Sequence, residues 1–217
     1  MEYIIEQLNY YPVSLGANCF PRLYIETIYK KSYPRLPFDY VGSPMWGINK
    51  AIQEDFKGFA SKKDILLYKI YGNSESEVIT NSNYMCSFIH DHKHTQMSDE
   101  KYNQVENDYS RRIQRWKNLI DGGSKLLFFR LMRIEENRIE YFEGKPSEKE
   151  ALEEFSGMMK TKVNFRILYF TYDQPNWYDP ESQIIYVNIP KIENLTDSLI
   201  NKLLSDIKIF KHVQANL

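Results

Sequence analysis

The chain has 217 residues, of which 28 are basic and 29 acidic, so the formal net charge at neutral pH is −1, and 42% of the residues are hydrophobic. This composition excludes a disordered chain, and the balanced charge gives no electrostatic reason to expect nucleic acid or an anionic membrane as a partner. The length predicts one domain over residues 1–217, with a single substantial core.

The N-terminal stretch MEYIIEQLNYYP has no basic segment followed by a long apolar run, so we expect neither a signal peptide nor a transit peptide. No segment approaches the roughly 20 apolar residues that a membrane-spanning helix needs. The two cysteines, Cys19 and Cys86, do not amount to a disulfide framework and fit a reducing compartment. We therefore expect a cytoplasmic protein that has no membrane partner.

Short apolar runs typical of strands alternate with longer segments of helical periodicity. In chain order, the predicted elements are a strand at 11–15, helices at 20–31 and 44–57, a further strand candidate at 65–71, a strand at 84–89, a helix at 98–120, a strand at 125–131, a helix at 147–159, strands at 165–172 and 183–189, and a helix at 195–211. Most of the strand segments are continuously apolar, as are strands buried on both faces of a parallel sheet. The pattern predicts an α/β fold, a three-layer sandwich with helices on both faces of a mostly parallel central sheet.

Polar residues follow most of the predicted strands. In open parallel sheets, ligands and catalytic groups gather outside the carboxyl ends of the strands. If these strands are parallel, the residues expected to converge at one edge of the sheet are Asn18 and Cys19, His90 and Asp91, Arg130 and Arg133, Asp173, and Asn188.

Cys19 is the candidate nucleophile. It follows Gly16 by three residues and precedes Pro21, which favours a place in the first turn of a helix. There the backbone N–H groups and the helix dipole favour a thiolate, and amides near Asn18 could hold an oxyanion. The alternative is a buried structural cysteine, which is how we interpret Cys86, because it lies within a predicted strand with no flanking base.

Three of the four histidines alternate in FIHDHKH, as His90, His92 and His94. In one interpretation His90 is a general base that reaches Cys19 and is held by an adjacent carboxylate. In another, the three imidazoles and Asp91 bind a metal ion, and in a third the segment is only a polar loop. Because no other carboxylate or cysteine group stands at a ligand spacing, we predict neither a metal nor another cofactor.

Asp39 and Arg130 complete the candidates. Asp39 lies in RLPFDYVGSPMWG, a loop dense in Pro, Gly and aromatic residues, where a firmly placed carboxylate could orient a histidine or make local turn hydrogen bonds. Arg130 ends a predicted strand and could hold an anionic group of a substrate or form a buried ion pair.

The segments VSLGANCF, PFDY, FIHD, YSRRIQRW and LLFFR, in this order, resemble a bacterial and viral family of unknown function whose members are described as papain-like cysteine peptidases. The resemblance covers about residues 13–130 and implies a Cys19 nucleophile, a His90 base and an acidic third member at Asp39 or Asp91. Tyr40 stands where the family usually has tryptophan. Since a strand is predicted before Cys19, the layout is closer to a three-layer hydrolase sheet with its nucleophile on the first strand-to-helix turn.

The sequence thus predicts a cysteine-dependent hydrolase that acts by peptidase-like or acyl-transfer chemistry through a thioester at Cys19. Its substrate would be a peptide or a small molecule, held in part by Asn18 and Arg130. The alternative is a non-enzymatic binding module that uses the same crevice for a small anionic ligand or a protein partner.

Overall fold

The main sheet of the computed structural model has the strand order β1-β5-β6-β8-β7. The structure describes residues 9–29, 31–69, 77–88, 98–132, 144–172, 174–189 and 207–217. Four strands are parallel, namely β1 (Tyr10–Ser14), β5 (Lys125–Leu131), β6 (Phe165–Thr171) and β8 (Ile184–Asn188), and the edge strand β7 (Trp177–Asp179) is antiparallel to β8. The mostly parallel sheet predicted from the sequence is confirmed.

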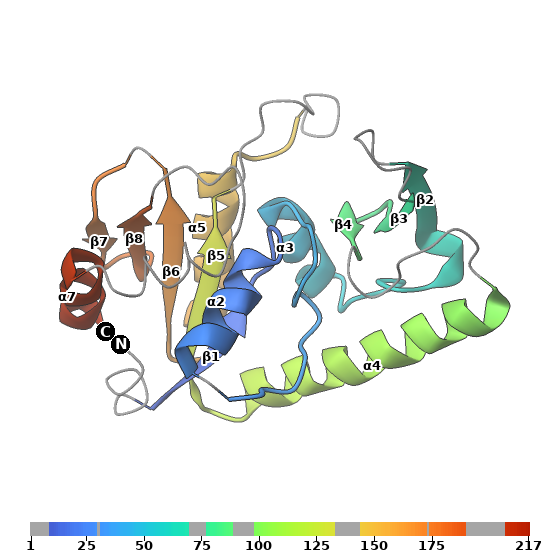
Figure 1. Ribbon diagram of the computed structural model, residues 1–217, viewed down its shortest axis with the longest axis horizontal. Helices are drawn as coiled ribbons and strands as arrows, with labels where there is room; N and C mark the ends of the chain where they lie inside the picture. Colours follow the sequence, from blue (N-terminus) through green and yellow to red (C-terminus); the bar gives the residue numbers. More distant parts are fainter. Residues whose placement is uncertain are drawn as a thin grey trace.

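Helices cover both faces of this sheet (Figure 1). Side chains of α2 (Phe20–Tyr29) and α7 (Ile207–Asn216) pack on one face, in a cluster with alternate residues of β5, β6 and β8. On the other face lie α3 (Met45–Gln53), α4 (Asp99–Asp121) and α5 (Glu148–Lys160), around the larger apolar cluster. The α/β three-layer sandwich is therefore confirmed.

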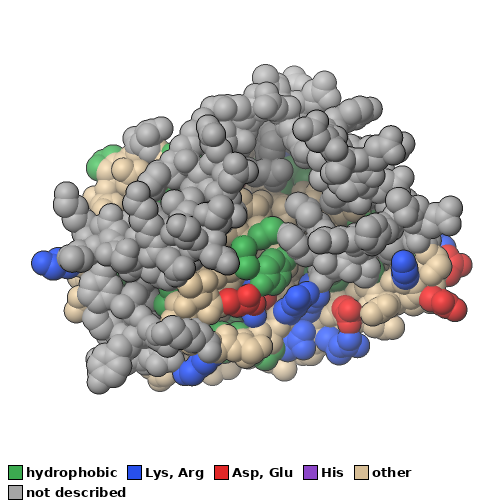
Figure 2. All heavy atoms as spheres, in the orientation of Figure 1, with side chains coloured by type: hydrophobic (Ala, Val, Ile, Leu, Met, Phe, Trp, Pro, Cys, Tyr) green, Lys and Arg blue, Asp and Glu red, His purple; other side chains and the backbone are tan. Residues whose placement is uncertain are grey.

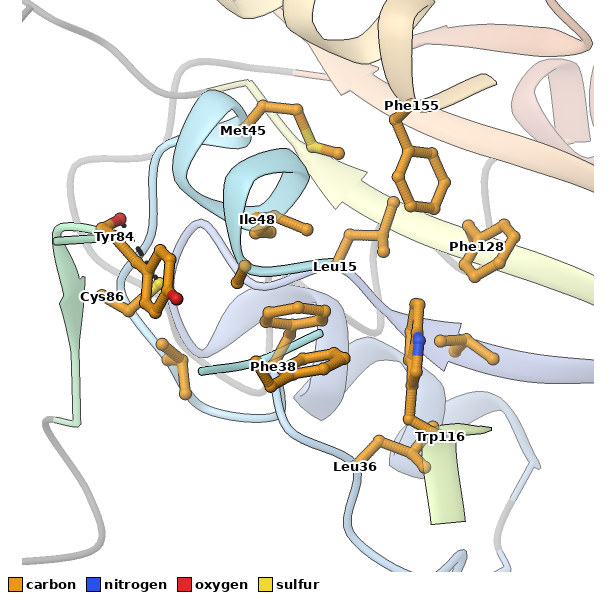
Figure 3. Packing of buried hydrophobic residues seen from close by; sticks show 14 of the residues in the cluster. Leu15, Leu36, Phe38, Met45, Ile48, Tyr84, Cys86, Trp116, Phe128 and Phe155 are labelled. Carbon is orange, nitrogen blue, oxygen red and sulfur yellow. Dashed lines mark hydrogen bonds between the residues drawn. The ribbon is translucent and has the colours of Figure 1, made fainter. Parts of the chain in front are cut away.

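Strand β5 shows why the run Leu126–Phe129 is continuously apolar. Leu127 and Phe129 point into the cluster of α2, whereas Leu126 and Phe128 belong to the cluster on the opposite face. The larger cluster is held by edge-to-face aromatic pairs, such as Phe128 and Phe155 with ring centroids 5.0 Å apart (Figure 3). Every side chain of the strand from Leu126 to Leu131 is buried, so none of these positions can be polar without a partner.

A second, smaller sheet corrects one prediction. It is antiparallel and consists of β2 (Ile65–Lys69), β3 (Glu77–Asn81) and β4 (Cys86–Ser87). The prediction that 84–89 is a strand of the parallel sheet was wrong, because the tight turn before Cys86, with Met85 at φ 52°, returns the chain onto β3. The apolar character of the segment comes instead from packing of Tyr84 and Phe88 on the aromatic cluster around Phe59.

Cys86 lies inside that cluster, as Figure 3 shows. Its side chain is fully buried, and its thiol donates a hydrogen bond to the Tyr84 carbonyl oxygen at 3.6 Å. The interpretation of Cys86 as a core residue is confirmed.

The helix bounds differ from the predicted ones for local reasons. Helix α3 ends at Gln53 rather than at 57 because Asp55 and Phe56 adopt left-handed backbone conformations, with φ of 52° and 60°, and the chain then forms the short 3-10 helix η1 (Lys62–Asp64). The predicted start of the last helix at 195 lies outside the described residues, which resume within α7.

On the face shown in Figure 2, basic and acidic side chains are interspersed along the margin that α4 forms in Figure 1. Within the described ranges, each helix is too short or too polar to cross a lipid bilayer.

Candidate active site

The chain leaves β1 through a turn that requires glycine. Gly16 has φ +67°, and a Cβ atom there would lie 2.5 Å from Ser43 Oγ and 2.9 Å from the Val41 carbonyl oxygen. Ala17 follows with φ +78°, a conformation that costs a residue with a side chain about 1–3 kcal/mol. The strand is therefore followed by a strained turn that is held from outside by the loop containing Val41 and Ser43.

Cys19 lies at the N-cap position of α2. Its carbonyl oxygen accepts the first intrahelical hydrogen bond from Leu23 N–H at 3.0 Å, and the Asn18 side-chain oxygen accepts the Phe20 N–H at 2.8 Å. Cys19 is half-buried and lies on the turn between the first strand and its helix, the place that the sequence predicted for it. Because Phe20 N–H is already paired with Asn18, that amide is not the donor that an oxyanion would use.

The electrostatic state of Cys19 differs from the expectation. Burial raises the pKa of the thiol, and this effect exceeds the opposing effect of a hydrogen bond from its own backbone. The helix terminus alone therefore leaves Cys19 as a neutral thiol near pH 7, and an ionised nucleophile needs a base.

Asp39 is buried against α2, with 1% of its surface exposed. Its Oδ2 atom accepts hydrogen bonds from Arg22 Nη1 at 2.9 Å and from Leu36 N–H at 2.8 Å, while Oδ1 is buried and has no hydrogen-bond partner among the described residues. Burial raises the pKa of the carboxyl to about 6, although the Arg22 guanidinium opposes this. Arg22 also binds Glu26, whose second oxygen accepts the Tyr40 hydroxyl.

Arg130 is completely buried and all arms of its guanidinium are used. Nε and Nη2 contact Glu148 Oε1 at 2.6 and 2.5 Å, Nη1 donates to the Leu15 carbonyl oxygen at 2.6 Å, and Nη2 donates to that of Ser43 at 2.9 Å. Of the two roles expected for Arg130, the geometry is that of the buried ion pair.

His90, Asp91, His92 and His94 lie outside the described residues, as do Arg133 and Asp173. Because β4 is not part of the main sheet, the argument that His90 shares an edge with Cys19 no longer follows from parallel strands. A different connection exists: Ser87 and Gly42 exchange backbone hydrogen bonds of 2.9 and 2.7 Å. Gly42 precedes Ser43, whose Oγ accepts the Ala17 N–H at 3.3 Å.

Asn188 is exposed at the carboxyl end of β8, where its N–H donates to the Asn176 side-chain oxygen at 2.6 Å. A surface hollow of about 510 Å³ lies at the opposite edge of the sheet, where β6 and β8 begin. It is lined by Val163, Phe165, Arg166 and Gln183 among others, and by none of the predicted site residues.

Sequence reasoning missed Ser43, Glu148 and Arg22. Glu148 lies in PSEKE, which signals a helix start but not a buried ion pair. Nothing in the local sequence distinguishes Ser43 or Arg22 from a surface residue.

The sequence model of one known family, described as "Putative papain-like cysteine peptidase (DUF1796)", matches residues 11–175. The match contains the β1–α2 turn with Cys19, Asp39, the FIHD segment and Arg130. No curated protein and no solved structure gives a significant match.

Proposed function

The chain belongs to this papain-like cysteine peptidase family, and on that premise we propose that it is a cysteine-dependent hydrolase in which Cys19 is the nucleophile and His90 the base. The observation that carries the proposal is the position of Cys19, half-buried at the N-cap of α2 directly after a glycine turn that leaves the sheet. Nucleophiles at strand-to-helix turns are exposed at the edge of the sheet, where helix amides can stabilise negative charge.

In this mechanism His90 takes the proton from the Cys19 thiol, and the sulfur attacks the acyl carbon of the substrate. The tetrahedral intermediate collapses to a thioester as the leaving group departs with the proton from His90. A water molecule then loses a proton to His90 and attacks the thioester, which releases the carboxylic acid and restores the thiol. The same steps serve peptide, ester and thioester substrates, so the substrate class is an acyl compound.

The requirement for a base follows from the raised pKa of Cys19. The described chain reaches Phe88, and its neighbour Ser87 pairs with Gly42 of the loop that contacts the Cys19 turn. His90 is the second residue after Phe88, and two residues of chain span at most about 7 Å. This connection supports the pairing of His90 with Cys19, with Asp39 or Asp91 as the group that orients the imidazole.

The test is the alkylation rate of Cys19 by iodoacetamide at pH 7, measured by mass spectrometry with buried Cys86 as the internal reference. We expect His90→Ala to slow alkylation of Cys19 about tenfold or more, because the thiol then keeps its raised pKa. His92→Ala and His94→Ala should leave the rate unchanged. An unchanged rate in His90→Ala would reject the dyad, and bound zinc that is lost from all three variants would establish the metal site instead.

Two observations favour a second candidate, a non-enzymatic binding module: the Phe20 N–H is already paired with the Asn18 side chain, and burial raises the pKa of Cys19 rather than lowering it. Equal and slow labelling of Cys19 and Cys86 over pH 6–8 would support that alternative.

A further inference from the structure

Two turns of the chain meet at the carboxyl edge of the sheet next to Cys19, and a single buried group binds both. The first turn, Leu15–Ala17, ends β1, and the second, Ser43–Met45, begins α3. Arg130 donates to the carbonyl oxygens of Leu15 and Ser43, which belong to one turn each. The two turns are also joined directly by the hydrogen bond from Ala17 N–H to Ser43 Oγ.

Glu148 fixes the orientation of this arginine. Its side chain is 9% exposed, its Oε1 atom accepts from Arg130 Nε and Nη2, and its Oε2 atom accepts the Met45 N–H at 3.3 Å. The guanidinium therefore has its charge neutralised in the interior and its N–H groups directed at the two turns. Four of the five N–H donors of this arginine are engaged within the described residues, and the side chain is fully buried, so its geometry is that of a structural group.

The hydrogen bond between Ala17 N–H and Ser43 Oγ restrains the strained part of the first turn, Leu15–Ala17. Ser43 is fully buried, and its hydroxyl lies against Gly16 so closely that no side chain fits there. Its Oγ atom accepts the N–H of Ala17, the residue with φ +78° two positions before Cys19. Left-handed conformations of residues other than glycine persist only when surrounding contacts hold them.

We propose that Ser43, Arg130 and Glu148 are positioning residues that hold the Cys19 turn in its reactive conformation. This assignment rests on the proposed function of Cys19 and gives Arg130 a role that differs from substrate binding. Loss of the Ser43 hydroxyl should let the Gly16–Ala17 segment relax and displace the Cys19 sulfur relative to the groups around it, which changes its reactivity.

The test compares Ser43→Ala with Ser156→Ala. Ser156 is equally buried, and its hydroxyl makes one hydrogen bond, to the Ser182 carbonyl oxygen at 2.5 Å, on the part of α5 distant from Glu148. Each variant is measured for unfolding in urea, for amide hydrogen exchange at Gly16 and Ala17, and for the pH profile of Cys19 alkylation.

We expect both variants to lose similar stability. Only Ser43→Ala should accelerate hydrogen exchange at Ala17, by about tenfold or more. Only Ser43→Ala should also change the rate of Cys19 alkylation at pH 7, by at least about threefold. Exchange and alkylation that match the wild type in Ser43→Ala, or that change equally in Ser156→Ala, would overturn the proposal. If Ser43→Ala does not fold, Glu148→Gln, which keeps the shape of the acceptor but removes the charge paired with Arg130, should show the same changes at Ala17 and Cys19, and their absence is equally decisive.

This test of the positioning role can be separated from the test of the proposed function. Hydrogen exchange at Ala17 reports whether Ser43 holds the turn, even if wild-type Cys19 labels no faster than Cys86 and the hydrolase assignment fails. Conversely, a reactive Cys19 with unaltered exchange in Ser43→Ala would keep the nucleophile and reject the positioning role.

Discussion

The carboxyl group of Asp39 is almost completely buried, and its two oxygens differ in their hydrogen bonds. One oxygen binds Arg22 and a backbone amide, whereas the other is buried and makes no hydrogen bond within the described part of the chain. Arg22 lies in the first turn of α2, the helix that follows Cys19. Asp39 therefore ties its loop to that helix, whether or not it also orients a histidine.

This environment predicts a pH dependence of stability. Burial raises the pKa of Asp39 from 3.8 to about 6, so between pH 4 and pH 6 the unfolded chain releases a proton that the folded protein retains. The contribution of this group to the free energy of unfolding is complete below about pH 4 and decreases as the pH rises to 6, by up to about 3 kcal/mol.

Asp39→Asn cannot ionise, so its stability relative to the wild type should increase steadily from pH 4 to pH 6 and become constant above pH 7. Urea unfolding of both proteins at one-unit intervals measures this difference. A difference that is independent of pH would contradict the assignment of a raised pKa.

At the scale of elements, the start of helix α5 places its first residue, Glu148, beside Arg130. The helix begins with a capping box, in which the Ser147 hydroxyl accepts the Glu150 N–H and the Glu150 carboxylate accepts the Ser147 N–H. The cap therefore defines where the ion-pair partner of Arg130 stands.

We expect Ser147→Ala to lower the free energy of unfolding by about 1 kcal/mol, because the Glu150 N–H loses its acceptor at the start of the helix. Ser110→Ala is the control: Ser110 lies exposed within α4, and its hydroxyl only donates back to the Glu106 carbonyl oxygen. That variant should change stability by less than about 0.5 kcal/mol in thermal or urea unfolding. Equal losses in the two variants would show that the cap contributes nothing of its own.

A comparison of the predicted and observed elements shows which of them could be predicted from the sequence. The predicted strand at 125–131 matches β5 residue for residue, because burial on both faces selects the apolar run Leu126–Phe129 that marks the strand in the sequence. The segment at 84–89 was wrongly placed, since an apolar run packed on an aromatic cluster beside a hairpin has the same composition as a central strand. Short edge strands such as β7 (Trp177–Asp179) have too few residues for a period to be visible.

For the candidate site, the sequence located Cys19 at its strand-to-helix turn because glycine and proline positions carry local backbone information. It did not reveal the pairing of Arg22 with Asp39, or of Arg130 with Glu148, because a charged residue looks the same in a sequence whether its partner is buried or it faces solvent. It also missed the raised pKa of Cys19, which depends on packing from other segments.

For the whole molecule, Arg130 is the residue where the sheet, both turns and α5 are connected. Arg130→Met should lower the free energy of unfolding by about 3–5 kcal/mol, because Glu148 would remain buried without its partner. Arg111→Met removes an exposed arginine of α4 and should cost less than about 1 kcal/mol. A loss in Arg130→Met no larger than that in Arg111→Met, measured by urea unfolding, would show that the buried pair contributes little.

Strand β1 pairs with β5, and the two are separated by more than a hundred residues in the chain, as in the pairing of Tyr10 with Lys125. During synthesis, Cys19 leaves the ribosome long before Arg130 and Glu148, and translation at about 5–20 residues per second makes that delay several seconds or longer. The N-terminal third of a nascent chain therefore carries the cysteine without the groups that complete its surroundings. A hydrolase organised in this way would stay inactive until most of its chain has been made.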